Sequence, residues 1–529
     1  MKRRGDSIAD PASPSPEAML LHEFLERSFA KHPDKTYLVA GGRRLSYADL
    51  EAGANRLASA LRSSGVGYGD RVVVFLDNSP EAVVSIFGIL KADAVFVPLN
   101  PTMKTEKLAW VLGDSRAAAL VTHESKWETA VAAARSAPSI KTVVLTGSLR
   151  EHPREQFAVR WWDEIQSSHD AGRPARTAID IDLAALIYTS GTTGNPKGVM
   201  LTHRNMVSAS TSITTYLENR EDDVILSVLP LSFDYGLYQI IMAAQFGGTV
   251  VLEKSFLYPY AVVSSLKAEK ATGFPIVPTI SAILLQMEEL RKESFPDLRY
   301  LTNTAAALPL SHIRGLRELF PGARLYSMYG LTECKRVSYL PPEELDRRPT
   351  SVGKGMPNEQ VYLVDDEDRL ITEPGAVGQL VVRGANVMQG YWERPDETEK
   401  VLRPGRWPWE RVLYTGDLFR MDDEGFLYFV SRGDDIIKSR GEKVSPKEVE
   451  NVLYEHPAVL EAAVVGVPDE TLGEAVKAYV VPKSGAAVTE KEIVAHCMRH
   501  LEDFMVPKFI EFREELPKTS TGKITKKGL

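Results

Sequence analysis

The chain has 529 residues, a formal net charge of −8 at pH 7 and a hydrophobic fraction of 44%. These values are typical of a globular protein with two or three domains, and the acidic balance argues against a nucleic-acid partner. Only two cysteines occur, Cys334 and Cys497, so a disulfide framework is excluded and a reducing, cytoplasmic location is expected.

The first 17 residues contain basic side chains but no apolar segment behind them. We therefore expect a disordered tail over residues 1–17 and no signal peptide. No run of about 18 uncharged apolar residues occurs later, so no transmembrane segment is expected.

Short apolar runs alternate with helical patterns through the next four hundred or so residues. Residues 71–76 predict a strand, residues 80–91 a helix and residues 94–98 another strand. This βαβ pattern predicts an α/β fold with largely parallel, doubly wound sheets. Residues 141–145, 183–188 and 248–252 are interpreted as a second series of the same kind.

The pattern changes after Arg432. Ser445-Pro-Lys-Glu448 predicts a capping box that opens a helix to about Tyr454. Strands over 461–466 and 475–481 and a helix over 489–501 follow, which predicts a small α+β domain. No carrier-protein or condensation domain is appended, so we expect a free-standing protein.

The most particular segment of the chain extends from Tyr188 to His203. It predicts a phosphate-binding turn between the strand at 183–188 and a helix after His203, because glycines allow close backbone approach while hydroxyls and a lysine donate hydrogen bonds. The residues concerned are Thr189, Ser190, Gly191, Thr192, Thr193, Gly194, Lys197 and Gly198. A P-loop is excluded, since the glycine spacing differs and Gly198 stands where a Ser or Thr would bind Mg²⁺.

This turn resembles the phosphate-binding signature of the adenylate-forming superfamily, which includes acyl-CoA synthetases, adenylation domains of nonribosomal peptide synthesis and beetle luciferases. Four more motifs of that family follow in its order, at 329–333, 414–417, 431–444 and 516–524. The resemblance implies an N-terminal adenylation core over 18–431, with a β-rich subdomain at roughly 325–430. It also implies a hinge over 432–435 and a small mobile α+β domain over 436–529.

The resemblance also assigns an ATP site with Mg²⁺. Activation of a carboxylate places two negative groups together, so cations and oriented donors are required there. Thr332 is expected to contact the α-phosphate, Glu333 to ligate Mg²⁺ and Tyr329 to lie along the adenine. Asp417 is expected to accept the ribose hydroxyls with the help of Arg432. The β- and γ-phosphates are assigned to Thr189, Ser190, Gly191, Thr192, Thr193, Gly194 and Lys197.

Three further roles are carried over from the family's C-terminal motifs. Lys523 is expected to be catalytic, bridging the substrate carboxylate and the α-phosphate. Asp434 corresponds to the hinge about which the C-terminal domain rotates. Gly441 would then line a tunnel for the phosphopantetheine thiol, where a side chain would narrow the passage.

The residues of the acid pocket are also predicted from the resemblance to the adenylate-forming superfamily. Asp234 stands at the position where amino-acid-adenylating domains bind the substrate α-ammonium, and a buried carboxylate needs a cationic partner. Cys334 is interpreted as a pocket-lining thiol, because no partner histidine is indicated. The remaining predicted pocket residues are Tyr235, Tyr238, Thr302, Thr304, Met328, Arg336 and Val337.

The resemblance implies an ATP-dependent acid–thiol ligase that releases pyrophosphate and then forms a thioester. The expected acid is a small amino acid such as proline, and the expected acceptor is the phosphopantetheine thiol of a separate carrier protein, as in nonribosomal peptide synthesis and secondary metabolism. An AMP-forming acyl-CoA synthetase for a small or aryl acid, with CoA as acceptor, is the alternative. A luciferase-like monooxygenase is a more remote one.

Overall fold

The computed structural model describes residues 20–148, 154–189, 196–433, 435–439, 442–469, 472–519, 524–526 and 528–529. The expected tail at 1–17 lies outside these residues. So do eight of the predicted site residues, namely Ser190, Gly191, Thr192, Thr193, Gly194, Asp434, Gly441 and Lys523.

One large sheet has eight strands in the order β19-β9-β8-β4-β3-β5-β6-β7. Neighbouring strands from β8 to β7 are parallel, whereas β9 pairs with β8 and β19 in the antiparallel sense. The strands are β3 (Arg71–Phe75), β4 (Val95–Pro98), β5 (Ala117–His123), β6 (Thr142–Thr146), β7 (Ala158–Trp161), β8 (Leu183–Thr189), β9 (Lys197–Thr202) and β19 (Gly390–Tyr391).

The second large sheet has nine strands in the order β16-β15-β14-β13-β12-β10-β11-β1-β2. Its central strands from β1 to β14 are parallel, and antiparallel strands close both edges. The strands are β1 (Thr36–Ala40), β2 (Arg43–Ser46), β10 (Val224–Ser227), β11 (Thr249–Leu252), β12 (Gly273–Ile276), β13 (Tyr300–Asn303), β14 (Arg324–Tyr329), β15 (Ser338–Tyr339) and β16 (Lys354–Gly355).

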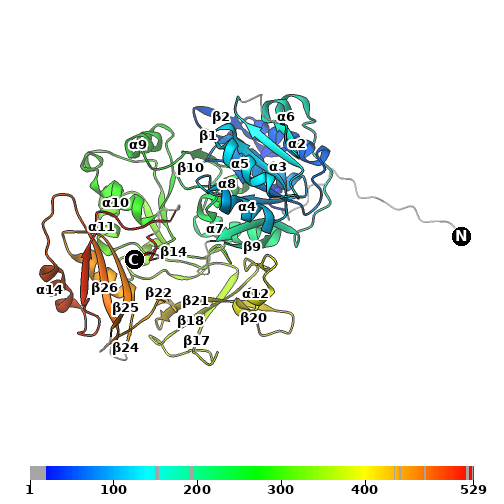
Figure 1. Ribbon diagram of the computed structural model, residues 1–529. Coiled ribbons are helices and arrows are strands. Elements are labelled where there is room, and N and C mark those ends of the chain that lie inside the picture. Colours follow the sequence, from blue (N-terminus) through cyan, green and yellow to red (C-terminus); the bar gives the residue numbers. More distant parts are fainter. Residues whose placement is uncertain are drawn as a thin grey trace.

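Helices fill the space between the two sheets and cover their outer faces (Figure 1). They are α1 (Glu23–Lys31), α2 (Tyr47–Ser63), α3 (Pro80–Lys91), α4 (Thr105–Asp114), α5 (Trp127–Arg135), α6 (Trp162–Ser168), α7 (His203–Tyr216), α8 (Asp234–Phe246), α9 (Pro259–Ala268), α10 (Pro278–Gln286) and α11 (Leu310–Leu319), with 3₁₀ turns η1 (Glu124–Lys126), η2 (Glu288–Lys292) and η3 (Pro342–Glu344).

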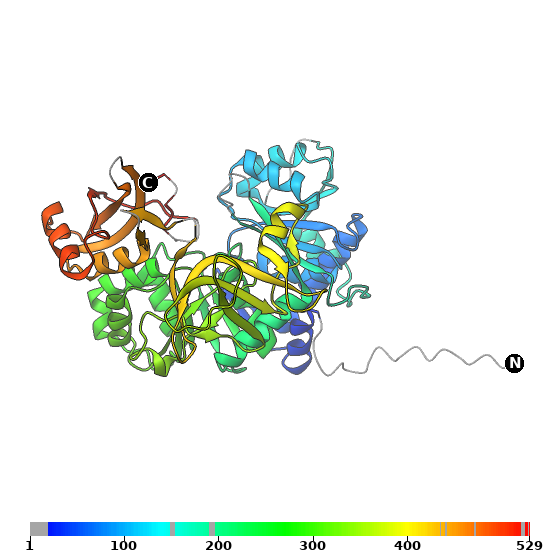
Figure 2. The same cartoon turned by 90° about the horizontal axis from the view of Figure 1, so that it is seen from below.

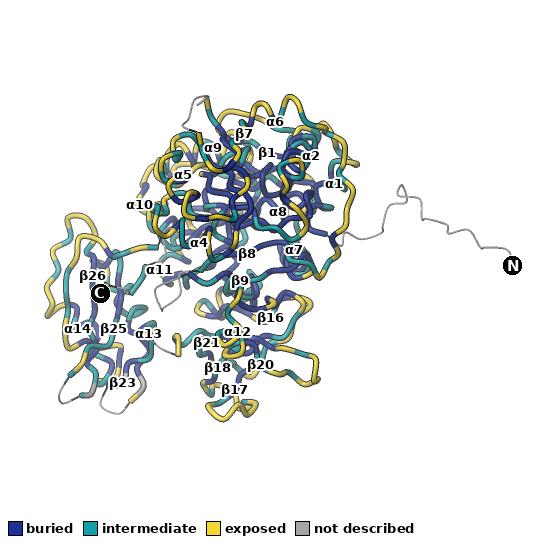
Figure 3. Tube along the Cα trace, turned by 45° about the vertical axis from the view of Figure 1, so that its right-hand side comes forward, coloured by how far each residue is buried: buried dark blue, intermediate teal, exposed yellow. Residues whose placement is uncertain are grey.

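Strand β3 explains this layering. Val72 and Val74 belong to a core shared by both sheets and by α2, α3 and α8, whereas Val73 and Phe75 belong to a second core with α4 and α5. Both faces of the strand are therefore buried, as expected of a parallel sheet covered on two sides. Figure 3 shows these buried strands, in dark blue, inside the N-terminal unit.

A third, fully antiparallel sheet forms the β-rich subdomain, in the order β17-β18-β21-β20 with β22 beside β21. Its elements are β17 (Glu359–Val364), β18 (Val377–Gly384), α12 (Pro395–Val401), β20 (Leu402–Pro404), β21 (Arg411–Met421) and β22 (Leu427–Arg432). The expected start near residue 325 is wrong for this sheet, because β14 to β16 extend the nine-stranded sheet.

The C-terminal unit, orange to red in Figures 1 and 2, lies beside α10 and α11. The ring of His312 on α11 is 6.5 Å from that of Tyr454, and Ser445 Oγ donates a hydrogen bond to Val430 O. The elements of this unit are β23 (Ile437–Ser439), β24 (Glu442–Val444), α13 (Pro446–Glu455), β25 (Val459–Asp469), β26 (Gly473–Pro482), α14 (Glu490–His500) and β27 (Phe509–Phe512).

The predicted fold class is confirmed: two doubly wound sheets with a β-rich subdomain, followed by a small α+β unit. One predicted series is wrong, because the strands at 141–145 and 183–188 lie in the eight-stranded sheet and the strand at 248–252 lies in the other. The predicted capping box at α13 is half-formed: Ser445 Oγ accepts a hydrogen bond from Glu448 N, but the Glu448 side chain does not accept one from Ser445 N.

Within the described residues, no helix has the length and apolar character needed to cross a membrane.

Candidate active site

The predicted phosphate-binding turn joins the ends of β8 and β9. These strands are antiparallel, and Thr189 pairs with Lys197 across the ladder. The expected strand–turn–helix arrangement is therefore wrong, because β9 intervenes before α7 begins at His203. A Cβ at Gly198 would lie 3.2 Å from Tyr188 and 3.3 Å from Trp392, so a glycine is needed for this close packing.

Lys197 lies next to the predicted metal-binding carboxylate. Its ammonium forms an ion pair with Glu397 of α12 and lies 5.3 Å from the centre of the Tyr391 ring. The Tyr391 hydroxyl donates a 2.8 Å hydrogen bond to Glu333 Oε1. Tyr391 thus lies between Lys197 and Glu333. Neither Tyr391 nor Glu397 was predicted from the sequence.

Glu333 is a suitable ligand for a divalent cation. Burial raises the pKa of its carboxyl group, against the opposing effects of the Tyr391 hydrogen bond and the charge of Arg432. A nearby metal ion would offset this desolvation cost. The described residues contain no cluster of three or more His, Cys, Asp or Glu ligands, but Mg²⁺ bound to phosphates needs only one or two carboxylates.

The residues predicted to bind the nucleoside also come together. The Tyr329 hydroxyl donates a 2.5 Å hydrogen bond to Asp417 Oδ2, and Arg432 Nε donates a 3.2 Å hydrogen bond to Asp417 Oδ1. The Tyr329 ring packs edge-to-face against Phe419, with centroids 4.8 Å apart. Asp417 is buried and held on both oxygens, so its acceptor geometry is preorganised.

A tight turn after β14 carries Thr332 and Glu333. A Cβ at Gly330 would lie 2.5 Å from Lys335 O, and Lys335 itself has a left-handed φ of 65°. The chain therefore folds back on Gly330 and directs the following residues into the interior. Among these, Lys335 and Arg336 are only 3% and 2% exposed.

Lys335 supplies the cation that Asp234 was expected to find in a substrate. Its Nζ lies 3.5 Å from Asp234 Oδ2, and it also lies 4.5 Å from the centre of the Tyr238 ring. Asp234 occupies the first turn of α8, where the helix dipole favours a negative charge. Asp234 therefore needs no substrate ammonium to stabilise its charge, since Lys335 and the start of α8 already do so. Lys335 was missed, although its neighbour Arg336 was predicted.

Two other predicted pocket residues, Tyr235 and Tyr238, lie beside Lys335, with ring centres 5.6 and 4.5 Å from its Nζ. The Tyr235 hydroxyl donates a 2.8 Å hydrogen bond to Thr302 O, and the Tyr216 hydroxyl contacts Met328 Sδ at 3.1 Å. Thr304 and Val337 are buried. Burial raises the pKa of the Cys334 thiol well above its usual value, which is unfavourable for a nucleophile.

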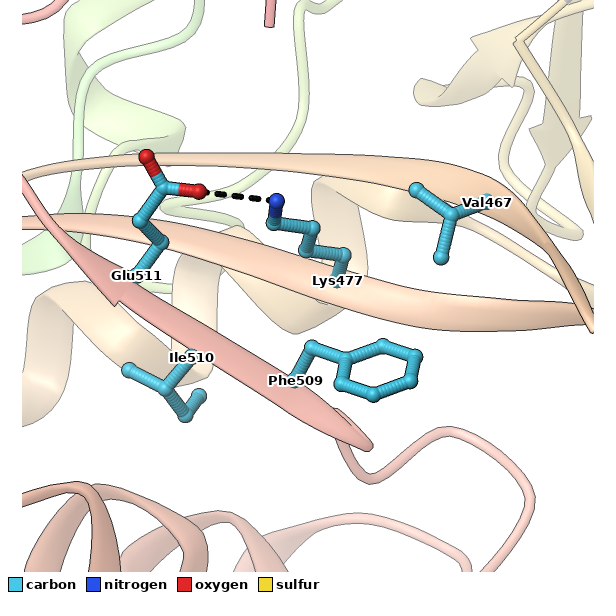
Figure 4. Close-up of a pocket in the computed structure, with 5 residues that line it drawn as sticks. All are labelled: Val467, Lys477, Phe509, Ile510 and Glu511. Atoms are coloured by element: carbon cyan, nitrogen blue, oxygen red, sulfur yellow. Dashed lines mark ion pairs between the residues drawn. The ribbon is translucent and has the colours of Figure 1, made fainter.

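A separate hollow of about 400 Å³ lies on the C-terminal sheet (Figure 4). It is bordered by Val467, Lys477, Phe509, Ile510 and Glu511. Lys477 and Glu511 form a 2.8 Å ion pair there, so both charges are already engaged. None of the predicted site residues borders this hollow.

The residues predicted for phosphate, metal and nucleoside lie close together, as expected of an adenylate-forming enzyme. Comparison with known families agrees: residues 25–392 match the AMP-binding enzyme model, and residues 448–523 match the AMP-binding enzyme C-terminal domain. The chain belongs to this family of AMP-forming acid–thiol ligases.

Relatives of known name act on different acids. The chain is 33% identical over 534 residues to a long-chain-fatty-acid–CoA ligase of Bacillus subtilis, covering 96% of this chain and 94% of the relative. It resembles the structure of the anthranilate CoA ligase AuaEII in complex with anthranoyl-AMP, with a TM-score of 0.87, 28% identity and 96% coverage of both chains. It also resembles o-succinylbenzoate CoA synthetase of B. subtilis with ATP and magnesium, with a TM-score of 0.82, 28% identity and coverage of 96% and 98%.

Proposed function

We propose that this protein is an AMP-forming acyl-CoA synthetase that uses ATP, Mg²⁺ and CoA. One observation supports the proposal above all: Lys197, Glu333 and Asp417 come from distant parts of the chain, and Tyr391 and Tyr329 hold them in place. Each residue suits a different part of Mg·ATP, so their joint preorganisation favours nucleotide chemistry over a structural role.

In the first half-reaction, ATP would be held at three points. Each carboxylate oxygen of Asp417 already accepts one hydrogen bond and has a second acceptor position for a ribose hydroxyl. Lys197 would leave Glu397 for the triphosphate. Glu333 would hold Mg²⁺, which neutralises phosphate charge when bound. Thr332 and Lys523 would contact the α-phosphate and the substrate carboxylate. The carboxylate oxygen attacks the α-phosphorus, the bond to pyrophosphate breaks, and an acyl-adenylate remains.

In the second half-reaction, the thiol of CoA attacks the acyl carbon and AMP leaves. Asp434 remains our candidate for the hinge between the two half-reactions, and Gly441 for the thiol tunnel. CoA is favoured over a carrier protein because the relatives of known name are CoA ligases.

An amino-acid substrate is disfavoured because Asp234 already faces Lys335. The cytoplasmic location stays a prediction from the cysteines.

Acid-dependent ATP–pyrophosphate exchange tests the proposal. Purified protein should incorporate labelled pyrophosphate into ATP only when a suitable acid and Mg²⁺ are present, and added CoA should convert the adenylate into acyl-CoA and AMP. Lys523→Ala should lose most of the exchange. Absence of exchange with any acid in a panel of amino, aryl, short and long-chain acids would refute adenylation, and thioester formation only on a carrier protein would refute CoA as the acceptor.

A further inference from the structure

Arg336 is a buried cation whose charge the described part of the chain leaves uncompensated. It is 2% exposed, and its Nε and Nη1 atoms have no hydrogen-bond acceptor within the part of the chain that the structure describes. Among the described residues it forms no ion pair. A buried polar group without a partner is costly, and a buried charge more so, which makes such a group a candidate for ligand binding.

Neither Asp234 nor Glu359 forms an ion pair with Arg336 in the described part of the chain. Glu359 instead accepts a 2.9 Å hydrogen bond from Asn386, which also donates one to Arg336 O. Asp234 lies at 3.5 Å from Lys335 Nζ, so the two form a pair of their own. The guanidinium of Arg336 instead lies 5.3 Å from the centre of the Tyr235 ring, a contact that lowers its energy without cancelling its charge. The guanidinium of Arg336 therefore has no ion-pair partner among the described residues, although it is buried in this part of the predicted acid pocket.

Arg336 also belongs to a different part of the site from the phosphate-binding groups. The cation that acts on Glu333 is Arg432, and the ammonium beside Tyr391 is that of Lys197. The neighbours of Arg336 are Tyr235, a residue of the predicted acid pocket, and Lys335, the partner of Asp234. Its free donors are thus suited to a group on the acid other than the carboxylate that reacts with ATP.

We propose that the preferred acid carries a second carboxylate, which Arg336 binds within the acid pocket. This inference rests on the proposed function and names its substrate class. A carboxylate matches the planar guanidinium and can accept two parallel hydrogen bonds. Aromatic walls from Tyr235 and Tyr238 suit the hydrocarbon or ring between the two carboxylates.

The same arrangement disfavours the other two substrate classes. The α-ammonium of an amino acid would face Arg336 and Lys335, and like charges at short range repel. An unsubstituted fatty acid would leave the guanidinium buried without an anion, and a site with unpaired polar groups discriminates strongly against a ligand that cannot pair them.

The test compares acids that differ only in the second carboxylate: butanoate with butanedioate, hexanoate with hexanedioate, and benzoate with benzene-1,3-dicarboxylate. In pyrophosphate exchange, the wild type should give a higher kcat/KM with one dicarboxylate than with its partner. In Arg336→Gln, the ratio of the two kcat/KM values should fall by about 100-fold, as expected when one member of a buried charge pair is removed. Val337→Ala changes the pocket without changing its charge, so it should leave that ratio nearly constant.

A second measurement does not depend on turnover. The preferred dicarboxylate should raise the melting temperature of the wild type in a concentration-dependent manner, and should do so far less for Arg336→Gln. Preference for monocarboxylates in the wild type, or an equal loss with both acids in Arg336→Gln, would overturn the inference while leaving adenylation intact. Failure of exchange with every acid would instead overturn the proposed function, and the melting shift would still report on dicarboxylate binding.

Discussion

The ion pair between Asp234 and Lys335 should stabilise the protein at pH 6 and contribute almost nothing at pH 8. Burial lowers the pKa of Lys335 from its usual 10.5 to about 7, although the charge of Asp234 opposes that change. We therefore consider a double-mutant cycle with Asp234→Asn, Lys335→Met and the double variant, in which only the interaction between the two side chains survives the subtraction.

The proton on Lys335 sets the size of the effect. At a separation of 3.5 Å and an effective dielectric constant of about 20, the attraction is about 5 kcal/mol. A lysine that loses Asp234 need not lose this whole attraction, however, because it can release its proton and become neutral. With a pKa of about 7 in the wild type, this release costs about 1 kcal/mol at pH 6 and almost nothing at pH 8. The smaller cost limits the measurable coupling.

The sign follows from proton binding. Because the folded pKa of Lys335 is below the unfolded value, the unfolded chain binds more protons between pH 7 and 10.5, and Lys335 makes stability rise with pH over that window. The stabilising contribution of Asp234 works in the opposite direction, since it requires the protonated lysine. The coupling energy should therefore decrease from pH 6 to pH 8.

Urea unfolding of the four proteins at both pH values measures the coupling. Tryptophan fluorescence is a suitable signal, because all seven tryptophans lie between Trp110 and Trp409 and report on the N-terminal unit alone. Equal coupling at the two pH values, or none at pH 6, would refute the reasoning. Asp234 would then be available again as a partner for a substrate ammonium.

Three further predictions concern the nucleotide site. Tyr329→Phe removes a hydrogen bond to Asp417, and since such bonds to charged groups contribute about 1.5–3 kcal/mol, the KM for ATP should rise at least tenfold; an unchanged KM would mean that Asp417 needs no such support. Gly330→Ala places a Cβ 2.5 Å from Lys335 O and should lower the free energy of unfolding by about 1–3 kcal/mol, whereas Gly322→Ala, with open space at its Cβ, is the matched control; equal effects would contradict the turn geometry. Glu333→Gln should abolish Mg²⁺-dependent exchange yet stabilise the ligand-free protein at pH 7. The pKa of Glu333 is raised above its usual 4.5, so the wild type loses stability as pH rises through that folded pKa, whereas the variant does not. If the free energy of unfolding changes equally with pH in both proteins between pH 4 and 7, the raised pKa of Glu333 is refuted.

The sequence by itself determined the family and supplied the prediction of the nucleotide site. The motifs around Lys197, Glu333 and Asp417 are local, and a glycine or a carboxylate at a given position in such a motif has one dominant use. Regular elements with strong periodicity were also predicted well: α3 extends from Pro80 to Lys91 as expected, because Pro follows the capping Ser79 and apolar residues surround the helix.

The tertiary structure decided which charges meet. Lys335 and Asp234 are a hundred and one residues apart, and no local pattern shows that burial on a turn after Gly330 brings them within 3.5 Å. Tyr391 and Glu397 were invisible for the same reason, since their partners Glu333 and Lys197 lie on other elements. Side-chain pairing across distant segments depends on packing and desolvation, which periodicity and motif spacing do not encode. The substrate class depends on such pairing, because whether Asp234 and Arg336 are free to bind an acid is settled only by what the fold places beside them.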